Sequence, residues 1–354
     1  MPKKSYIPLD GKKIRDILVI KPSSMGDIVH SFPAVALLQK YCPDAKIDFV
    51  IKPEFADLLD YAPFTVERKI IFERRKLGSP GKILPELLKL RKVLRRKKYD
   101  LTVDLQGLFR SALCAGLAKS RHTAGFAAPR EKAATFYYDL KVPVKSLHAI
   151  EKQMELISTL FGGTEKLAEP PPPVVNDELP AGMPHQNLIT VFPASLWKSK
   201  EFPLKIFADI ISGLHRHFPA YSFAVCGSKK EVRIMQELYD ALPNGFPLID
   251  LTGKTSLRQL FAVIDHSDAV LCNDSGPLHI AAYLRKNCFA FFGPTDPRRT
   301  GPWYENSKVY RNTSGCTACL KRKCRTGTQC CLNISTDQVI SDICTVLKKN
   351  NPAK

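Results

Sequence analysis

An anion-binding turn is the feature of this sequence best suited to chemistry. Residues 273–279, Asn-Asp-Ser-Gly-Pro-Leu-His, lie between two apolar runs. This order predicts a buried strand that ends at the Asp-Ser-Gly triplet and a helix that begins at Pro277. The unpaired backbone N–H groups at such a helix start attract anions, so the segment predicts a phosphate site. A plain helix cap by Asp274 or Ser275 is the alternative that the heptapeptide alone leaves open.

A second loop supports the same site. The apolar residues 288–292 run into residues 293–297, Gly-Pro-Thr-Asp-Pro, which favour a turn with close backbone approach. Ligands of open α/β sheets bind at the carboxyl ends of the strands. We therefore expect both loops to meet at one edge of a sheet and to share a ligand there.

One carboxylate and two lysines are candidates for group-transfer chemistry. Asp27 follows a strand predicted over 16–21, where it could act as a general base or cap the next helix. Lys198 and Lys200 follow a strand predicted over 188–192. A lysine's point charge suits a phosphate, and a solvated loop lysine is the alternative for either residue.

Alternating strands and helices are expected to position these residues. At 354 residues the chain is long enough for two domains. Strand–helix–strand spacing predicts parallel sheets, so we expect an α/β fold with two Rossmann-like doubly wound domains facing a cleft. The predicted organisation is a first domain over 1–168, a proline-rich linker over 169–180, a second domain over 181–334, and a C-terminal helix and tail over 335–354.

The charge of the chain points to an acidic partner. The formal net charge is +19, and a helix predicted over 83–98 carries many of the basic residues. Its cations are either a solvated face or a surface near anionic lipid headgroups. No run approaches the roughly 18 apolar residues of a membrane-spanning helix, and no signal-peptide core follows Met1, so we expect a cytoplasmic protein.

Taken together, the motifs resemble glycosyltransferase family 9, the heptosyltransferases of lipopolysaccharide core assembly. The resemblance is carried by residues 17–30, 104–107, 128–137, 148–149, 200–203, 274–279 and 292–296. It implies a GT-B fold, with an ADP-heptose donor on the C-terminal domain and an acceptor on the N-terminal domain. It also implies inverting transfer without a metal or any other cofactor.

The resemblance implies a role for each candidate residue. Asp27 would be the catalytic base, and Lys200 would contact the departing diphosphate. Donor binding is implied for Ser195, Lys198, Glu231, Asp274, Ser275, Gly276 and His279. Acceptor binding is implied for Gln106, Arg110 and Arg130, with Arg121 as a less certain addition.

The resemblance also implies the partners. ADP-heptose is expected as a substrate, and Kdo–lipid A is expected as the acceptor at the cytoplasmic face of the inner membrane. No nucleic-acid partner is expected, and the protein is expected to be a monomer.

A cysteine cluster near the C-terminus could hold a metal. It consists of Cys316, Cys319, Cys324, Cys330 and Cys331. Thiolates at such spacing can close a tetrahedron around zinc or an iron–sulfur centre, but the paired knuckles of a zinc ribbon are missing. Many members of the resembled family have cysteines in this region, so we expect local or redox-sensitive thiols and no metal.

Two other functions compete with this interpretation. A basic nucleic-acid-binding protein with a cysteine knuckle would interleave aromatic residues with its cations, whereas residues 82–98 contain none. A GT-B transferase that uses a different nucleotide sugar is the closer alternative.

Overall fold

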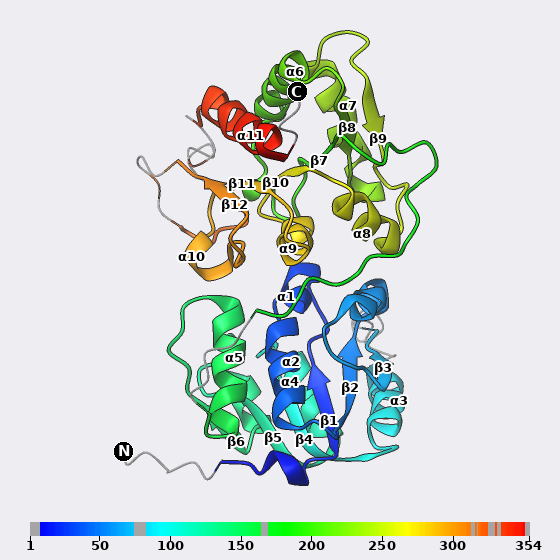
Figure 1. Cartoon of the computed structure of the whole chain (residues 1–354). Helices are drawn as coiled ribbons and strands as arrows, with labels where there is room; N and C mark the ends of the chain where they lie inside the picture. Colours follow the sequence, from blue (N-terminus) through cyan, green and yellow to red (C-terminus); the bar gives the residue numbers. More distant parts are fainter. Residues whose placement is uncertain are drawn as a thin grey trace. The chain divides into compact units, whose positions relative to one another are not determined.

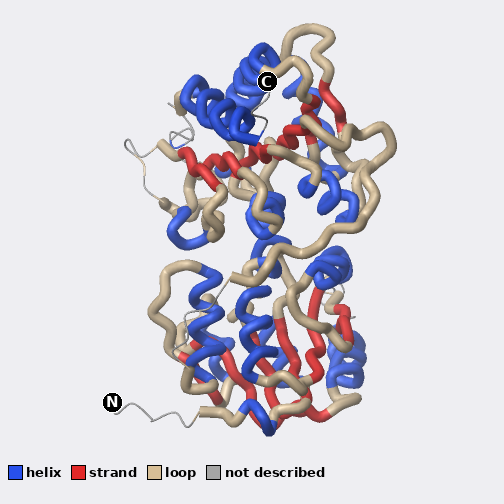
Figure 2. The backbone as a smooth tube through the Cα atoms, viewed as in Figure 1, coloured by secondary structure: helices blue, strands red, loops and turns tan. Residues whose placement is uncertain are grey.

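The computed structural model divides the chain into two compact units, Met1–Pro173 and Val174–Lys354 (Figure 1). It describes residues 8–73, 83–163, 169–312, 316, 318–324, 330 and 334–350. The division between the units falls within the proline-rich segment. Each unit is an α/β layer structure in which helices flank one sheet (Figure 2).

The N-terminal unit is built on a six-stranded parallel sheet with the strand order β3-β2-β1-β4-β5-β6. Its strands are β1 (Asp16–Ile20), β2 (Lys46–Ile51), β3 (Arg68–Ile71), β4 (Lys98–Asp104), β5 (Lys119–Phe126) and β6 (Leu140–Val142). Its helices are α1 (Met25–Val29), α2 (Phe32–Tyr41), α3 (Ile83–Leu94), α4 (Phe109–Leu117) and α5 (Ala149–Leu160), with short 3-10 turns η1 (Gly11–Lys13), η2 (Pro53–Tyr61) and η5 (Lys132–Tyr137).

The C-terminal unit repeats this plan in the order β12-β11-β10-β7-β8-β9. Its strands are β7 (Leu188–Phe192), β8 (Ser222–Val225), β9 (Leu248–Asp250), β10 (Ala269–Asn273), β11 (Cys288–Phe291) and β12 (Ser307–Tyr310). Its helices are α6 (Leu204–His217), α7 (Val232–Ala241), α8 (Leu257–Asp265), α9 (Gly276–Tyr283), α10 (Pro297–Thr300) and α11 (Thr336–Asn350), with 3-10 turns η6 (Lys198–Lys200) and η7 (Lys229–Glu231).

The strand order of each sheet fixes where a ligand is expected. In both units the first and fourth strands are neighbours, β1 beside β4 and β7 beside β10, and the chain winds outward from this pair in both directions. The loops that leave such a pair diverge and open a crevice at the carboxyl ends of the strands. The two predicted Rossmann-like domains are therefore confirmed, and each has one such point.

Apolar strands and helix faces form the core of each unit. The strands β7 and β10 are buried along their whole length, and they pack with aromatic residues such as Phe207 and Phe291. In the N-terminal unit, Leu18 and Ile20 of β1 pack with Leu94 of α3. Strands buried on both faces explain the near-continuous apolar runs of the sequence.

Three helix boundaries differ from the sequence prediction. The helix expected after Asp27 is two helices, because Pro33 in the first turn of α2 has no N–H to continue the hydrogen bonding of α1. Helix α3 ends at Leu94 instead of extending to residue 98, where β4 begins. Helix α9 begins at Gly276, so Pro277 occupies its second position.

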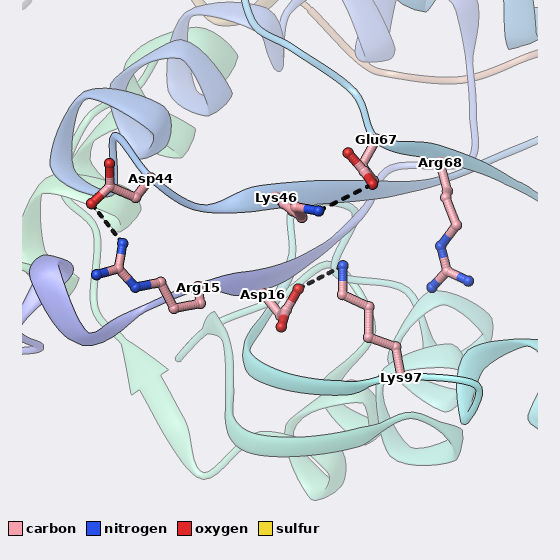
Figure 3. Close-up of a pocket in the computed structure, with 7 residues that line it drawn as sticks. All are labelled: Arg15, Asp16, Asp44, Lys46, Glu67, Arg68 and Lys97. Atoms are coloured by element: carbon pink, nitrogen blue, oxygen red, sulfur yellow. Dashed lines mark hydrogen bonds and ion pairs between the residues drawn. The ribbon is translucent and has the colours of Figure 1, made fainter.

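A charged pocket lies at the amino ends of β1 to β4, at the opposite edge of the sheet from the strand ends where ligands are expected. Its volume is about 480 Å³, and it is lined by Arg15, Asp16, Asp44, Lys46, Glu67, Arg68 and Lys97 (Figure 3). The lining cations pair with carboxylates, for example Arg15 with Asp44 at 2.6 Å and Lys97 with Asp16 at 2.6 Å. The pocket is thus largely self-neutralised.

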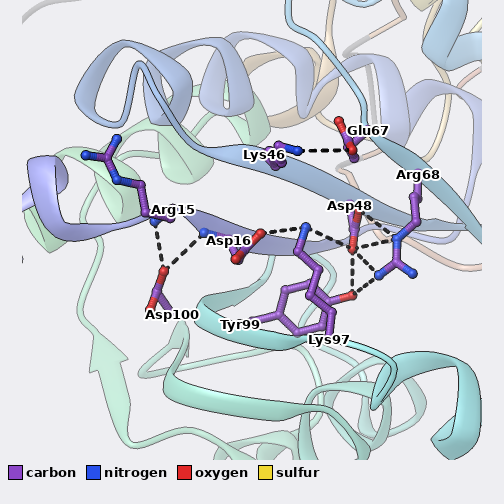
Figure 4. A network of polar contacts seen from close by, with 9 residues as sticks. All are labelled: Arg15, Asp16, Lys46, Asp48, Glu67, Arg68, Lys97, Tyr99 and Asp100. Atoms are coloured by element: carbon purple, nitrogen blue, oxygen red, sulfur yellow. Dashed lines mark hydrogen bonds and ion pairs between the residues drawn. The ribbon is translucent and has the colours of Figure 1, made fainter.

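Beneath this pocket a fully buried carboxylate joins three strands. The Arg68 guanidinium donates to both oxygens of Asp48, at 2.6 Å for the shortest contact, and the Tyr99 hydroxyl donates to Asp48 at 2.7 Å (Figure 4). Burial and this bond raise the pKa of Tyr99, so its hydroxyl remains a donor. A buried carboxylate is tolerated here because several donors satisfy it.

We expect Arg68→Met to destabilise the N-terminal unit by about 2 kcal/mol. Breaking a buried ion pair costs about 3–5 kcal/mol, and we discount this value because the Arg68 side chain is 34% exposed. Lys46→Met is the matched control, because Lys46 pairs with Glu67 on the surface of the same pocket. Urea unfolding measures the free energy of unfolding of the two variants. Equal losses of stability in Arg68→Met and Lys46→Met would contradict the structural role of the Asp48 network.

Candidate active site

Most donor-binding candidates of the C-terminal unit lie at the carboxyl ends of β7 and β10. The side chain of Asn273, the last residue of β10, ties the two strand ends together. Its amide nitrogen donates to the Pro193 carbonyl at 2.6 Å, and its amide oxygen accepts from the Phe202 N–H at 3.4 Å. The Ser195 hydroxyl then donates to the Asp274 carbonyl at 3.2 Å. The sequence thus places Ser195 and Asp274 at the predicted edge.

Asp274 is the centre of this cluster. Its carboxylate is 3% exposed, and one oxygen lies 2.7 Å from the Lys200 ammonium and accepts from the Thr295 hydroxyl at 2.6 Å. The other oxygen lies 3.8 Å from Nε2 of His279 in α9. Thr295 belongs to the loop after β11, so the two loops expected to meet at this edge do so. Asp274 therefore fixes both that loop and Lys200.

The structure distinguishes the two lysines that the sequence left open. The Lys200 side chain is 17% exposed and lies between Asp274 and the indole of Trp197, with its nitrogen 4.9 Å from the ring centroid. The Lys198 side chain is 83% exposed and pairs with Glu201 at 2.8 Å. A partly desolvated, oriented cation stabilises an anion more strongly than a solvated one. Lys200 is the better placed of the two for a diphosphate.

Helix α9 begins where the sequence predicts an anion site. Ser275 is its N-cap, and Gly276 and Pro277 open its first turn. The Ser275 hydroxyl oxygen is buried and has no hydrogen-bond partner within the described part of the chain. The unpaired N–H groups of a first turn and the helix dipole attract negative charge. This end of α9 lies next to Asp274 in the chain and thus adds positive potential beside Lys200.

Glu231 occupies a neighbouring strand end. It follows β8, and one of its carboxylate oxygens accepts from the Ser228 N–H at 2.6 Å, as in a capping box. A Cβ added at Gly227 would lie 3.0 Å from the same oxygen, so a larger residue there would require the Glu231 side chain to shift. Glu231 thus lies after β8, the strand that neighbours β7, and the described contacts do not connect it to the Asp274 cluster.

Sequence reasoning missed three residues of this cluster. Thr295 holds Asp274, Trp197 flanks Lys200, and the Arg322 guanidinium lies 5.2 Å from the Trp197 ring centroid. The Gly-Pro-Thr-Asp loop was a usable signal for Thr295. Nothing local in the sequence brings Arg322 to Trp197, because that contact depends on the path of the chain after β12.

In the N-terminal unit, Asp27 lies at the third position of α1 and not in the preceding turn. One of its carboxylate oxygens accepts from the Ser24 N–H at 3.0 Å and from the Ser24 hydroxyl at 2.7 Å. Asp27 therefore caps its helix, as the alternative interpretation held. It is only partly buried, so capping does not remove it from a substrate.

A buried lysine and a buried aspartate lie behind Asp27. Lys21 directly follows β1, and its ammonium donates a hydrogen bond to the Leu105 carbonyl at 2.8 Å. Burial lowers the pKa of Lys21, and the nearby carboxylates of Asp27 and Asp104 oppose that shift. This cation was not predicted as a site residue, although its position at the end of the first strand was a signal.

Asp104 organises the loop that carries two acceptor candidates. Its carboxylate accepts from the N–H groups of Gln106 and Gly107 at 2.8 and 3.2 Å, and from the hydroxyls of Ser111 and Tyr138. Burial raises the pKa of Asp104, and these donors oppose the shift. Gly107 has a positive φ of 67°, a conformation that favours glycine.

Three acceptor candidates lie on two adjoining segments: Gln106 and Arg110 at the loop before α4 and its first turn, and Arg130 on the loop after β5. The Glu131 N–H donates to the Gly107 carbonyl at 3.2 Å, and the Phe109 N–H donates to the Glu131 carboxylate at 2.7 Å. These bonds bring the segment of Arg130 beside that of Gln106 and Arg110. Arg110 and Arg130 are exposed, and the Gln106 side-chain oxygen is buried with no partner among the described residues.

The cysteine cluster is only partly described. Cys316 and Cys319 are free thiols, and Cys331 lies outside the described residues. Within the described ranges, no three His, Cys, Asp or Glu side chains come together as a metal site.

Comparison with known proteins identifies the family. The family model of glycosyltransferase family 9 (heptosyltransferase) matches residues 87–329. Lipopolysaccharide heptosyltransferase 1 of Escherichia coli O18:K1:H7 is 29% identical over 307 residues, which cover 83% of this chain and 91% of that protein. Lipooligosaccharide heptosyltransferase 2 of Campylobacter jejuni is 25% identical, with 95% and 99% of the two chains covered.

Solved structures show the same architecture. The structure of Escherichia coli ADP-heptose LPS heptosyltransferase II superposes with a TM-score of 0.77 at 25% identity and covers 95% of this chain and 99% of its own. Escherichia coli heptosyltransferase WaaC with ADP gives a TM-score of 0.76 at 24% identity, with 94% and 99% covered, and shows the shared GT-B fold. The family model matches well over half of the chain, so this protein belongs to glycosyltransferase family 9, the heptosyltransferases.

Proposed function

We propose that the protein transfers L-glycero-D-manno-heptose from ADP-heptose to the Kdo–lipid A inner core, with inversion at the anomeric carbon. The observation that carries this proposal is the cluster at the start of α9, where Asp274 holds Lys200 at 2.7 Å beside an anion-attracting helix end. Such a cluster suits a diphosphate leaving group. Acting on a lipid acceptor, the enzyme would work at the cytoplasmic face of the inner membrane.

The proposed reaction is a single displacement. Asp27 accepts the proton of the acceptor hydroxyl, and the hydroxyl oxygen forms a bond to the anomeric carbon of the heptose. The bond from that carbon to the diphosphate oxygen breaks with its electron pair, and ADP leaves. Lys200 and the N–H groups of α9 stabilise the charge that develops on the diphosphate. These groups supply the positive potential, so we expect turnover to persist in the presence of EDTA.

Nucleotide selectivity tests the donor assignment. A ligand that binds the folded state raises the melting temperature in proportion to the logarithm of its concentration over Kd. We expect ADP to raise the melting temperature and UDP at the same concentration to have little effect. A larger shift with UDP would favour the alternative of a GT-B transferase with another nucleotide sugar. Family membership speaks against the nucleic-acid-binding alternative.

We expect Arg130→Ala to raise the KM for the acceptor about tenfold and to leave the donor KM unchanged. A charge-assisted hydrogen bond to a phosphate or carboxylate of the acceptor contributes roughly 1.5–3 kcal/mol. Steady-state kinetics with each substrate varied in turn measures this, and Lys132→Ala is the control because Lys132 is an exposed cation two residues away. Equal changes in both KM values would remove Arg130 from the acceptor site.

A further inference from the structure

Helix α3 has one face in the core and one face in solvent. On the inner side Leu90 and Val93 pack against the N-terminal core, and Leu94 is fully buried. In Figure 1, α3 lies beside β3 at the edge of the sheet of its own unit. Helical periodicity then turns the remaining positions outward.

The outer face combines exposed leucines with cations. Leu84 and Leu88, one helical turn apart, are 66% and 54% exposed. Arg91 continues this stripe, and Lys89 and Lys92 flank it as exposed cations. Arg95 and Arg96, also exposed, follow in the turn after the helix. Two of these cations have partners within the chain: Lys89 pairs with Glu86 at 3.0 Å, and Arg95 donates to the Leu117 carbonyl at 3.1 Å.

This face has no acidic residue. The single acid of α3, Glu86, pairs with Lys89, and its side chain is 20% exposed. Arg91, Lys92 and Arg96 form no ion pair with the part of the chain that the structure describes. A surface helix usually intersperses both charge signs, so five cations around two leucines call for an anionic partner that also accepts apolar side chains.

We propose that the outer face of α3 docks the protein on an anionic lipid surface. The leucines would enter the boundary between headgroups and acyl chains while the cations contact the phosphates. A nucleic acid fits this face less well, because exposed leucines have no role on a phosphate backbone and α3 carries no aromatic residue for base stacking. Among the described helices, none combines the length and the apolar character of a membrane span.

Sedimentation with lipid vesicles tests this proposal on the full-length protein. We expect the wild type to bind vesicles of equal parts phosphatidylglycerol and phosphatidylcholine, and to bind pure phosphatidylcholine weakly. Each Lys or Arg near an anionic surface contributes about a factor of five, so Lys92→Glu with Arg96→Glu should weaken binding at least about 30-fold, the effect of losing the two cations alone. Leu84→Ser with Leu88→Ser should weaken it at least about fivefold at unchanged net charge.

Lys348→Glu with Lys349→Glu is the matched control, because it removes the same charge from the exposed end of α11. The proposal is overturned if the wild type does not bind the anionic vesicles, if the control pair weakens binding as much as the α3 pair, or if the leucine variant binds as the wild type does. Tighter binding to RNA or duplex DNA than to the vesicles, lost in the same α3 variants, would replace the lipid by a nucleic acid.

The docking proposal rests on the proposed function in one respect: docking would bring the enzyme to its lipid acceptor. Separate measurements can contradict the docking surface and the proposed function. Transfer to a deacylated, water-soluble Kdo acceptor needs no membrane, so the α3 variants should turn it over at the wild-type rate. If the wild type binds anionic vesicles but transfers heptose neither to Kdo–lipid A nor to the deacylated acceptor, the proposed function fails and the docking surface stands. If the wild type transfers heptose but does not bind the anionic vesicles, the docking surface alone is contradicted.

Discussion

Asp27→Asn is expected to lower kcat about 1,000-fold while ADP still raises the melting temperature. General base catalysis contributes about 10²–10⁴-fold, and an amide cannot take the proton of the acceptor hydroxyl. The asparagine oxygen can still accept the two bonds from Ser24, so α1 keeps its cap. Single-turnover kinetics with saturating donor and acceptor measures the chemical step.

Ser24→Ala separates the base role of Asp27 from its capping role. This variant removes the hydroxyl bond to Asp27 and leaves the carboxylate, so we expect less than about a tenfold loss of kcat. Near-normal turnover of Asp27→Asn would show that Asp27 only caps its helix. A loss in Ser24→Ala as large as in Asp27→Asn would point to the shape of α1 and not to proton transfer.

Lys200→Ala is expected to lower kcat by about 100-fold or more. Removal of one preorganised donor from a developing anion costs roughly 10²–10³ in kcat. The same change leaves the buried Asp274 without its cation, so a loss of stability is also expected. Lys200→Arg keeps the charge and should restore the stability but only part of kcat, because the bulkier guanidinium does not follow the bridging oxygen as an ammonium does.

Lys198→Ala is the matched control for Lys200→Ala. Lys198 belongs to the same 3-10 turn and has the same charge, but it is exposed and pairs with Glu201. We expect a change of less than about threefold in kcat. Similar losses in the two variants would mean that the local positive charge matters and the position of Lys200 does not.

Much of the architecture could be predicted from the sequence. Apolar runs bounded by Gly, Pro and Asp predicted central strands such as β1, β7 and β10, since buried parallel strands leave a strong local signal. The more exposed strands β5, β6 and β12 were not predicted. The segment 273–279 was likewise readable as a strand end followed by a helix, and β10 and α9 confirm it. The boundary between α1 and α2 was missed although Pro33 marked it.

The candidate site was less accessible to prediction, because its contacts are not local. Asp274 accepts a hydrogen bond from Thr295 and pairs with Lys200. These contacts depend on three loops that meet at one sheet edge. The choice between Lys198 and Lys200 depends on burial, which two lysines in one turn do not reveal. The docking face of α3 was visible only in part, because helical periodicity identified the cations while the exposure of Leu84 and Leu88 needed the structure.

The central claim is that the chain moves heptose from ADP-heptose to a Kdo–lipid A acceptor with Asp27 as base. Mass spectrometry of the acceptor after incubation with purified protein tests it most directly. We predict that the wild type adds one heptosyl residue per acceptor and releases one ADP, and that Asp27→Asn gives no product in the same time. An acceptor of unchanged mass with ADP-heptose, or equal product from Asp27→Asn, would contradict the account.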